Sequence, residues 1–275
     1  MDGAIGSLLQ EQGLSMNSSI WSSAIQIESP DKLLNLHRAY VKAGADIITT
    51  NTFRSNPLAV KNFDICFDFK LLVQTAITIA KKTLQNHHIL AGSNPPAEDC
   101  YSERRTISRY ELEYNHKEHI STLWENNVDF ILNETQSHFD EIILTSKFCS
   151  ENNIPFITSI FTIDGERILS NEKLDYVIET VLDFNPICVS INCVCIDTFR
   201  KIYPLIENKT HAFYLNCGSG NFTDNSISCG TSAKEYLTQI KKYFTANLFF
   251  VGSCCGSNPN HTKEIFNYVN VQNKN

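Results

Sequence analysis

Three kinds of sequence feature are absent from this chain. No apolar run approaches the roughly 18 residues that a membrane helix requires, and residues 1–6 lack the basic stretch and apolar run of a signal peptide. The 23 lysines and arginines are scattered and the formal net charge is −7, so the basic patch that nucleic-acid binding needs is missing. We therefore expect a cytoplasmic protein that acts on small molecules and binds neither nucleic acid nor membrane.

The chain also lacks low-complexity segments, short repeats and any linker rich in proline or glycine. Its 275 residues, 42% of them hydrophobic, are close to the length of about 250 residues that is typical of one α/β barrel. We predict a single domain over residues 1–275, present as a monomer or a small homo-oligomer.

Two alternating patterns fill the chain: short apolar runs rich in β-forming residues, and longer segments with helical periodicity. The runs predict seven strands, at 46–49, 89–92, 130–133, 156–160, 187–191, 212–215 and 248–251. Helices are predicted at 31–43, 71–84, 109–126, 139–152, 174–184, 198–206, 233–245 and about 260–271.

This alternation predicts a parallel sheet covered by helices, either doubly wound or closed into a barrel. An eighth strand would have to precede Asp2, so the barrel requires a first strand reduced to a stub. We predict an α/β fold, a TIM (β/α)8 barrel with a shortened first strand, and keep the doubly wound sheet as the alternative.

Polar residues follow the predicted strands with a regularity that scattered residues would not show. In a barrel the chemistry lies at the carboxyl ends of the strands. The residues at these ends are Asp2-Gly3, Thr50-Asn51-Thr52, Gly92-Ser93, Glu134-Thr135, Asn192-Cys193, Asn216-Cys217-Gly218 and Cys254-Cys255.

Cysteines at two of these ends indicate a metal site. A reducing compartment disfavours a disulfide framework, so the ten cysteines are candidates for packing, reactivity or metal binding. The neighbouring thiols of Cys254 and Cys255 can turn toward one ion, with Cys193 as the third ligand, and three thiolates leave a fourth zinc position open. Spacing alone favours inert packing equally, and Cys195 and Cys217 are near enough in sequence to compete as ligands.

The other polar residues have structural explanations as well. Asp2 is also explained as a solvated terminal carboxylate, and Glu134 as an acid at a helix N-terminus. Thr52 and Asn216 are equally compatible with turns.

Several motifs resemble those of the homocysteine S-methyltransferases. The most specific is residues 43–53, Ala-Gly-Ala-Asp-Ile-Ile-Thr-Thr-Asn-Thr-Phe, and the matches follow the family order over nearly the whole chain. Ala4 and Ser253 replace glycines of the family pattern, and Ser219 stands where the family often has glutamate. The remaining matches are residues 2–7, Glu134-Thr135, Ile191-Asn192-Cys193, Tyr214-Leu215-Asn216, and Gly252-Ser253-Cys254-Cys255 with Pro259-Asn260-His261.

The resemblance implies a barrel that carries Zn²⁺ on Cys193, Cys254 and Cys255, with the homocysteine thiol at the fourth position. It further implies roles for residues around the metal. Asp2 and Glu134 would hold the substrate ammonium, Gly3 and Thr52 the carboxylate, Asn216 would line the pocket, and Phe53 is a candidate contact for the methyl donor.

The implied activity is methyl transfer from a sulfonium donor to L-homocysteine, which gives methionine. S-methylmethionine is the preferred donor and S-adenosylmethionine the next, because the chain lacks both the C-terminal arm of betaine-using members and a glycine-rich nucleotide fingerprint. Two alternatives stay open: a homocysteine module that uses a partner's methylcobalamin, and a catalytically silent zinc- or thiol-binding protein.

Overall fold

The centre of the molecule is a curled parallel sheet. The computed structural model describes residues 1–13, 20–62, 68–219 and 227–272. Within these residues the sheet has seven strands in the order β1-β2-β3-β4-β5-β6-β9. The strands are β1 (Ile47–Thr49), β2 (Ile89–Asn94), β3 (Phe130–Gln136), β4 (Phe156–Ile160), β5 (Cys188–Asn192), β6 (His211–Leu215) and β9 (Leu248–Ser253).

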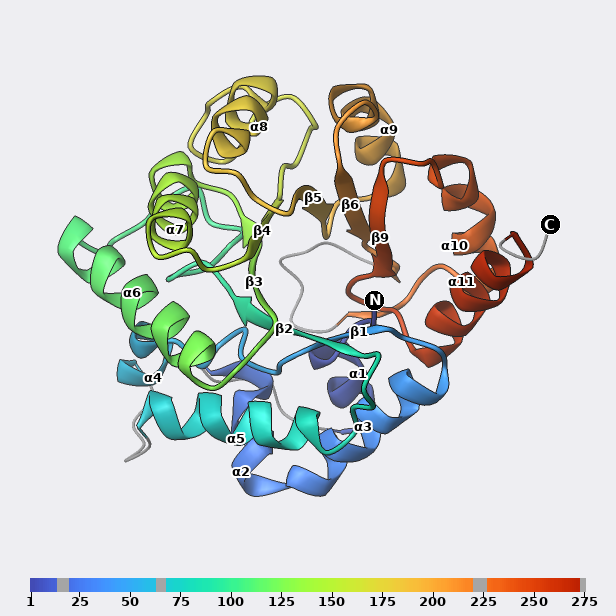
Figure 1. Cartoon of the computed structure of the whole chain (residues 1–275), viewed down its shortest axis with the longest axis horizontal. Helices are drawn as coiled ribbons and strands as arrows, with labels where there is room; N and C mark the ends of the chain where they lie inside the picture. Colours follow the sequence, from blue (N-terminus) through green and yellow to red (C-terminus); the bar gives the residue numbers. More distant parts are fainter. Residues whose placement is uncertain (14–19, 63–67, 220–226, 273–275) are drawn as a thin grey trace.

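Helices surround this sheet, as Figure 1 shows, with the strands inside the ring. Every pair of neighbouring strands is parallel, and the spatial order follows the order along the chain. A doubly wound sheet reverses its strand order at a switch point, so this topology excludes it and confirms the barrel prediction. The helices are α1 (Gly6–Glu11), α2 (Ile25–Glu28), α3 (Pro30–Lys42), α4 (Pro57–Lys61), α5 (Phe69–Lys81), α6 (Arg109–Glu125), α7 (Phe139–Glu151), α8 (Leu174–Leu182), α9 (Ile196–Ile206), α10 (Ala233–Ile240) and α11 (Pro259–Gln272).

The sheet is incomplete, because β1 and β9 remain its two edges. Met1 and Asp2 lie between these edges: the Met1 ammonium donates to the Val251 oxygen (3.0 Å) and the Asp2 N–H to the Ile47 oxygen (2.8 Å). Two residues thus occupy the position of the expected first strand without forming one. The structure contains the predicted stub in this form.

Strand residues form a core of their own inside the barrel. This cluster contains buried side chains from the strands and none from the helices, which is expected where alternate strand residues point inward. Its members are Ile47, Ala91, Phe130, Leu132, Ile157, Cys188, Ala212, Tyr214 and Phe250. The larger clusters outside the sheet join strands to helices. No helix in the described part of the chain has the length and apolar character to cross a membrane.

Some elements differ from the sequence prediction. β2 and β3 continue through the polar residues that we expected after them, so Ser93 and Glu134 belong to strands. Short helices such as α1 and α4, the one-turn 3-10 helix Trp21–Ala24 and the hairpin of β7 (Gly218–Ser219) and β8 (Ser228–Cys229) were not predicted. Each is too short to show a periodic pattern.

Candidate metal and substrate site

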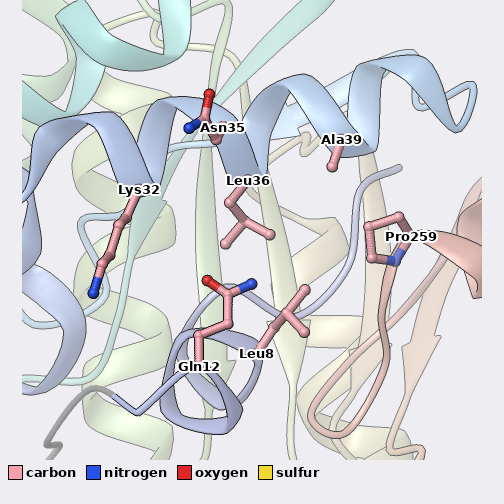
Figure 2. A pocket seen from close by; sticks show the side chains of 7 residues that line it. All are labelled: Leu8, Gln12, Lys32, Asn35, Leu36, Ala39 and Pro259. Atoms are coloured by element: carbon pink, nitrogen blue, oxygen red, sulfur yellow. The ribbon is translucent and has the colours of Figure 1, made fainter.

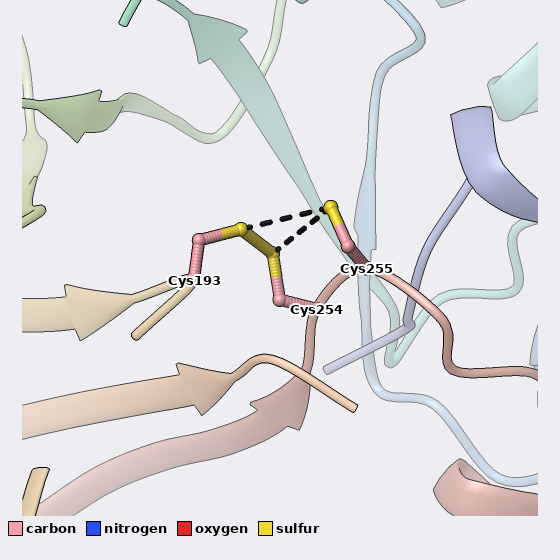
Figure 3. Close-up of side chains that lie close together, drawn as sticks. All are labelled: Cys193, Cys254 and Cys255. Carbon is pink, nitrogen blue, oxygen red and sulfur yellow. Dashed lines mark hydrogen bonds between the residues drawn. A yellow bond between two sulfur atoms is a disulfide. The ribbon is translucent and has the colours of Figure 1, made fainter. Parts of the chain in front are cut away.

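The carboxyl ends of β5 and β9 bring three cysteines together, as the sequence predicted. Cys193 follows β5 directly, and Cys254 and Cys255 follow β9 (Figure 3). The Cys255 sulfur lies 3.8 Å from that of Cys193 and 3.9 Å from that of Cys254. Cys193 and Cys254 are joined by a disulfide, which the sequence did not predict. It links two strand ends at one site and leaves Cys255 as a free thiol.

Backbone contacts through β6 hold the cysteine loops in place. The N–H of Cys193 donates to the Tyr214 oxygen (3.1 Å), and that of Cys254 to the Leu215 oxygen (2.8 Å). Gly256 has a φ of +77°, and a Cβ atom there would lie 2.4 Å from the Gly218 Cα. Only glycine therefore permits the close approach of these two loops.

The sulfur positions fit a tetrahedral metal. Zinc–sulfur bonds of about 2.3 Å place two thiolate ligands about 3.8 Å apart, close to both distances from Cys255. Among the described residues, the three cysteines form the one group of histidine, cysteine or acidic side chains close enough to share an ion. Cys195 lies beside the Thr198 hydroxyl (3.3 Å) and Cys217 beside the Leu215 oxygen (3.7 Å), so neither belongs to this group.

The environment of Cys255 opposes a free thiolate. Burial, together with the negative charge of Glu134, raises the pKa of the Cys255 thiol to about 11. A thiolate at this position therefore needs a cation beside it. The Glu134 carboxylate therefore lies near enough to the cysteine cluster for its charge to act on this thiol.

Asp2 lies fully buried at the edge of β1. Its carboxylate accepts hydrogen bonds from the Thr49 N–H (2.8 Å) and the Thr49 hydroxyl (3.0 Å). Burial raises the Asp2 pKa to about 7, against the lowering effects of Thr49 and of the Met1 ammonium, and the nearby charge of Glu134 adds to the rise. No described lysine, arginine or histidine forms an ion pair with Asp2.

Glu134 faces the same site from a bulge in β3. Asn133 to Gln136 pair with Thr158 to Ile160, so β3 contains one extra residue, and Thr135 has a φ of +57°. Ser93 donates its hydroxyl to the Glu134 carboxylate (2.6 Å). Burial raises the Glu134 pKa, although the Ser93 and Tyr214 hydroxyls oppose the rise.

Asn192, at the end of β5, fixes this bulge. Its side-chain oxygen accepts from the Thr135 N–H (3.2 Å) and the Ser159 hydroxyl (2.8 Å), and its amide donates to the Thr135 hydroxyl (2.8 Å). The next residue is Cys193, which also has a positive φ, +55°. One side chain thus ties the glutamate segment to the first cysteine. The sequence placed Asn192 at a strand end but gave no sign of this role.

The other predicted site residues have partners within the protein. Thr52 donates its hydroxyl to the Ser93 oxygen (2.7 Å) and its N–H to the Thr50 oxygen (2.8 Å). Asn216 accepts from the Gly218 N–H (2.8 Å), which is the turn interaction that its residue type favours. A Cβ atom on Gly3 would lie 2.7 Å from the Ser257 hydroxyl, so the backbone approaches closely there.

Phe53 belongs to an aromatic stack that the sequence did not reveal. Its ring packs against Trp21 at a centroid distance of 5.7 Å. The Arg54 guanidinium lies 4.4 Å from the Trp21 ring and 5.6 Å from the Phe53 ring. The nearest cation to these rings is therefore a residue of the protein itself.

Fold and site together define a parallel α/β barrel protein with a three-cysteine centre beside the buried carboxylate of Asp2 and the partly buried carboxylate of Glu134. The family model described as Homocysteine S-methyltransferase matches residues 1–269, and the chain belongs to this family of methyltransferases.

Curated relatives cover most of the chain. Homocysteine S-methyltransferase 1 of Brassica oleracea var. italica is 23% identical and aligns with 96% of this chain and 91% of that protein. Homocysteine S-methyltransferase of Escherichia coli is 21% identical over 94% of this chain and 91% of that protein. Betaine–homocysteine S-methyltransferase 1 of Xenopus laevis is 22% identical and aligns with 96% of this chain and 71% of that protein.

Solved structures show the same fold. The metallated form of the homocysteine methyltransferase MmuM from Escherichia coli superposes with a TM-score of 0.78 at 21% identity, covering 98% of this chain and 95% of that one. The oxidized form of the same enzyme also superposes with a TM-score of 0.78, at 20% identity, and covers 97% of this chain and 94% of that one. The TIM-barrel architecture of this chain is thereby confirmed.

Proposed function

We propose that this enzyme transfers a methyl group from a sulfonium donor to the thiol of L-homocysteine and forms methionine. S-methylmethionine is the preferred donor and S-adenosylmethionine the next. The observation that carries the proposal is the convergence of three cysteine sulfurs with Asp2 and Glu134, two acids without an ion-pair partner in the described chain.

Cys193, Cys254 and Cys255 are the proposed zinc ligands. The distances from the Cys255 sulfur fit two edges of a tetrahedron, and the solved structure of a metallated relative supports a metal in this family. Reduction of the Cys193–Cys254 disulfide must precede binding, because thiolates are the ligands. Zinc at this position would hold a substrate thiol in its thiolate form, which is the nucleophilic form.

The two carboxylates give the site its preference for an amino acid. The charge of Glu134 helps to raise the pKa of Asp2, and an α-ammonium group between the two acids would relieve that repulsion. The substrate carboxylate would then lie toward the Gly3 backbone and Thr52, with Asn216 at the pocket wall. Both donor groups of Thr52 already have acceptors, so its part in binding requires one of these bonds to be exchanged.

Zinc content and methionine formation, measured on the same reduced protein, test the proposal. We expect about one zinc per chain and turnover with S-methylmethionine, which S-adenosylmethionine and betaine would not exceed. Cys255→Ala should lose both zinc and activity, because only two of the three thiolate ligands remain. Cys229→Ala is the matched control, since this exposed cysteine lies outside the cluster.

Each contrary result identifies a different failure. Zinc without turnover by any donor would leave a zinc-binding protein, and turnover only with a methylcobalamin-carrying partner would replace the sulfonium donor. Absence of zinc from the reduced, metal-replete protein would refute the proposed centre.

A further inference from the structure

Arg54 is a buried cation without a matching anion. Its side chain is 7% exposed, and no described aspartate or glutamate forms an ion pair with it. Nη1 donates to the Glu98 backbone oxygen (2.8 Å), whereas Nε has no hydrogen-bond partner in the described structure. Buried charges are normally paired, because removal from water costs more than a single neutral acceptor returns.

The aromatic stack fixes the orientation of this guanidinium. Trp21 and Phe53 both contact it, at 4.4 Å and 5.6 Å from their ring centroids. Rings stabilise a cation but accept few hydrogen bonds, so they hold the planar group in place and leave donors for another molecule. This arrangement suits a carboxylate, which a guanidinium binds with two parallel hydrogen bonds.

The position of Arg54 relates it to the cysteine centre. It follows β1 by five residues, in the segment that leaves the carboxyl end of the sheet. Burial raises the pKa of Cys100 to about 12, and the charges of Arg54 and Cys255 act on that same thiol in opposite directions. Thr52, two residues before Arg54, donates its hydroxyl to the Ser93 oxygen, and the Ser93 hydroxyl donates to the Glu134 carboxylate, so hydrogen bonds join the Arg54 segment to the proposed site.

We infer that Arg54 is the binding subsite for the carboxylate of the methyl donor. The inference rests on the proposed function. A sulfonium group is repelled by the guanidinium and must lie away from it, toward the thiolates. In S-methylmethionine three carbon atoms separate the sulfonium from the carboxylate, so one molecule can satisfy both positions.

Homocysteine fits this subsite less well. Its carboxylate shares one carbon atom with the ammonium group, and we place that ammonium at Asp2 and Glu134. Among the described side chains, the hydrogen bonds to the Asp2 and Glu134 carboxylates come from Thr49 and Ser93 and none comes from Arg54. We therefore assign the guanidinium to the second substrate.

Binding measurements without homocysteine test the subsite, because no reaction then takes place. The ligands are S-methylmethionine and its methyl ester, which has the sulfonium but no carboxylate. The wild-type protein should bind S-methylmethionine about 10- to 100-fold more tightly than the ester, as expected for a charged hydrogen-bonded pair. In Arg54→Gln this preference should fall to about one, while the affinity for homocysteine stays unchanged.

Two further variants complete the experiment. Arg54→Lys keeps the charge but loses the two-pronged geometry, so an intermediate preference is expected. Arg109→Gln removes a charge from an arginine that is 85% exposed and should behave as wild type. If Arg54→Gln does not fold, the wild-type preference and its reduction in Arg54→Lys still decide the question.

Equal binding of S-methylmethionine and its ester by the wild type would overturn the inference. So would an Arg54→Gln variant that keeps the wild-type preference for S-methylmethionine, or one that loses affinity for homocysteine instead. Methionine formation by the wild type is a separate readout. Its absence would refute the proposed function, whereas the ester comparison reports on the subsite alone.

Discussion

Two fully buried carboxylates in this barrel have opposite electrostatic environments. Glu141, on α7, accepts from His116 Nε2 (2.7 Å) and the Ala97 N–H (2.7 Å), and its other oxygen lies 3.6 Å from Arg105 Nη1. Burial alone would raise its pKa, but these partners bring it below the ordinary value. Asp2 accepts only from Thr49 among described side chains, and its pKa is raised to about 7.

The comparison separates a structural charge from a binding charge. The protein supplies His116 and Arg105 as partners for Glu141, so its ionised form belongs to the folded state. For Asp2, burial outweighs both its hydrogen bonds and the charge of the Met1 ammonium. For Glu134, burial outweighs the hydrogen bonds, so a cation from outside would stabilise the ionised form of either acid. Substitutions of the two kinds of acid should therefore affect different properties.

The largest expected effect is on stability, from Glu141→Gln. Removal of one partner from a buried ion pair leaves His116 without its acid, while Arg105 keeps Asp140, and should reduce the free energy of unfolding by about 3–5 kcal/mol. Urea denaturation measures this loss, while the KM for homocysteine of the folded fraction stays near the wild-type value. A changed KM at unchanged stability would place Glu141 in the binding site instead.

Glu134→Gln should show the reverse behaviour. Loss of the negative charge should lower kcat/KM for homocysteine by about 30-fold, or roughly 2 kcal/mol, through KM. Stability should stay equal or rise, because the ionised acid is disfavoured by burial. Steady-state kinetics and urea denaturation on the same sample test both parts. Glu113→Gln, at a partly exposed position of α6, is the control for a simple change of charge.

The pH dependence of Asp2 gives a smaller effect. Its pKa lies above the unfolded value of 3.8, so its contribution to stability is complete below about pH 4 and is lost as the pH rises through about 7. Homocysteine binding should change in the opposite direction, because the ammonium needs the ionised acid. Calorimetric affinities from pH 6 to pH 8 should rise more steeply for wild type than for Asp2→Asn. Parallel profiles would show that another group titrates.

The smallest expected effect comes from Arg105→Gln. This side chain is 18% exposed and lies 3.6 Å from Glu141, so its loss should cost about 0.5–1 kcal/mol in the free energy of unfolding. Thermal denaturation at low and high salt measures it. A loss as large as that of Glu141→Gln would show that Arg105, rather than His116, balances the buried acid.

Much of the fold was predictable because its signals are local. Each central strand is an apolar run of β-forming residues, and those runs located all seven strands to within a few residues. The ends of β2 and β3 were placed too early, because Asn94 and Gln136 are polar residues buried through contacts with distant parts of the chain. The residues next to Asn94 and Gln136 in the sequence do not indicate these distant partners.

The site also has some features that the sequence determined and others that only the tertiary structure decided. Sequence alone determined the cysteines, Asp2 and Glu134 as candidates, because parallel strands bring their carboxyl ends together whatever the loops contain. Only the tertiary structure decided that Asn192 ties β3 to β5, that Thr49 binds Asp2, and that Arg54 lies against two aromatic rings without an ion-pair partner among the described residues. Each of these contacts joins side chains that are distant in sequence. Packing in the folded protein decides which side chains meet and how they are oriented.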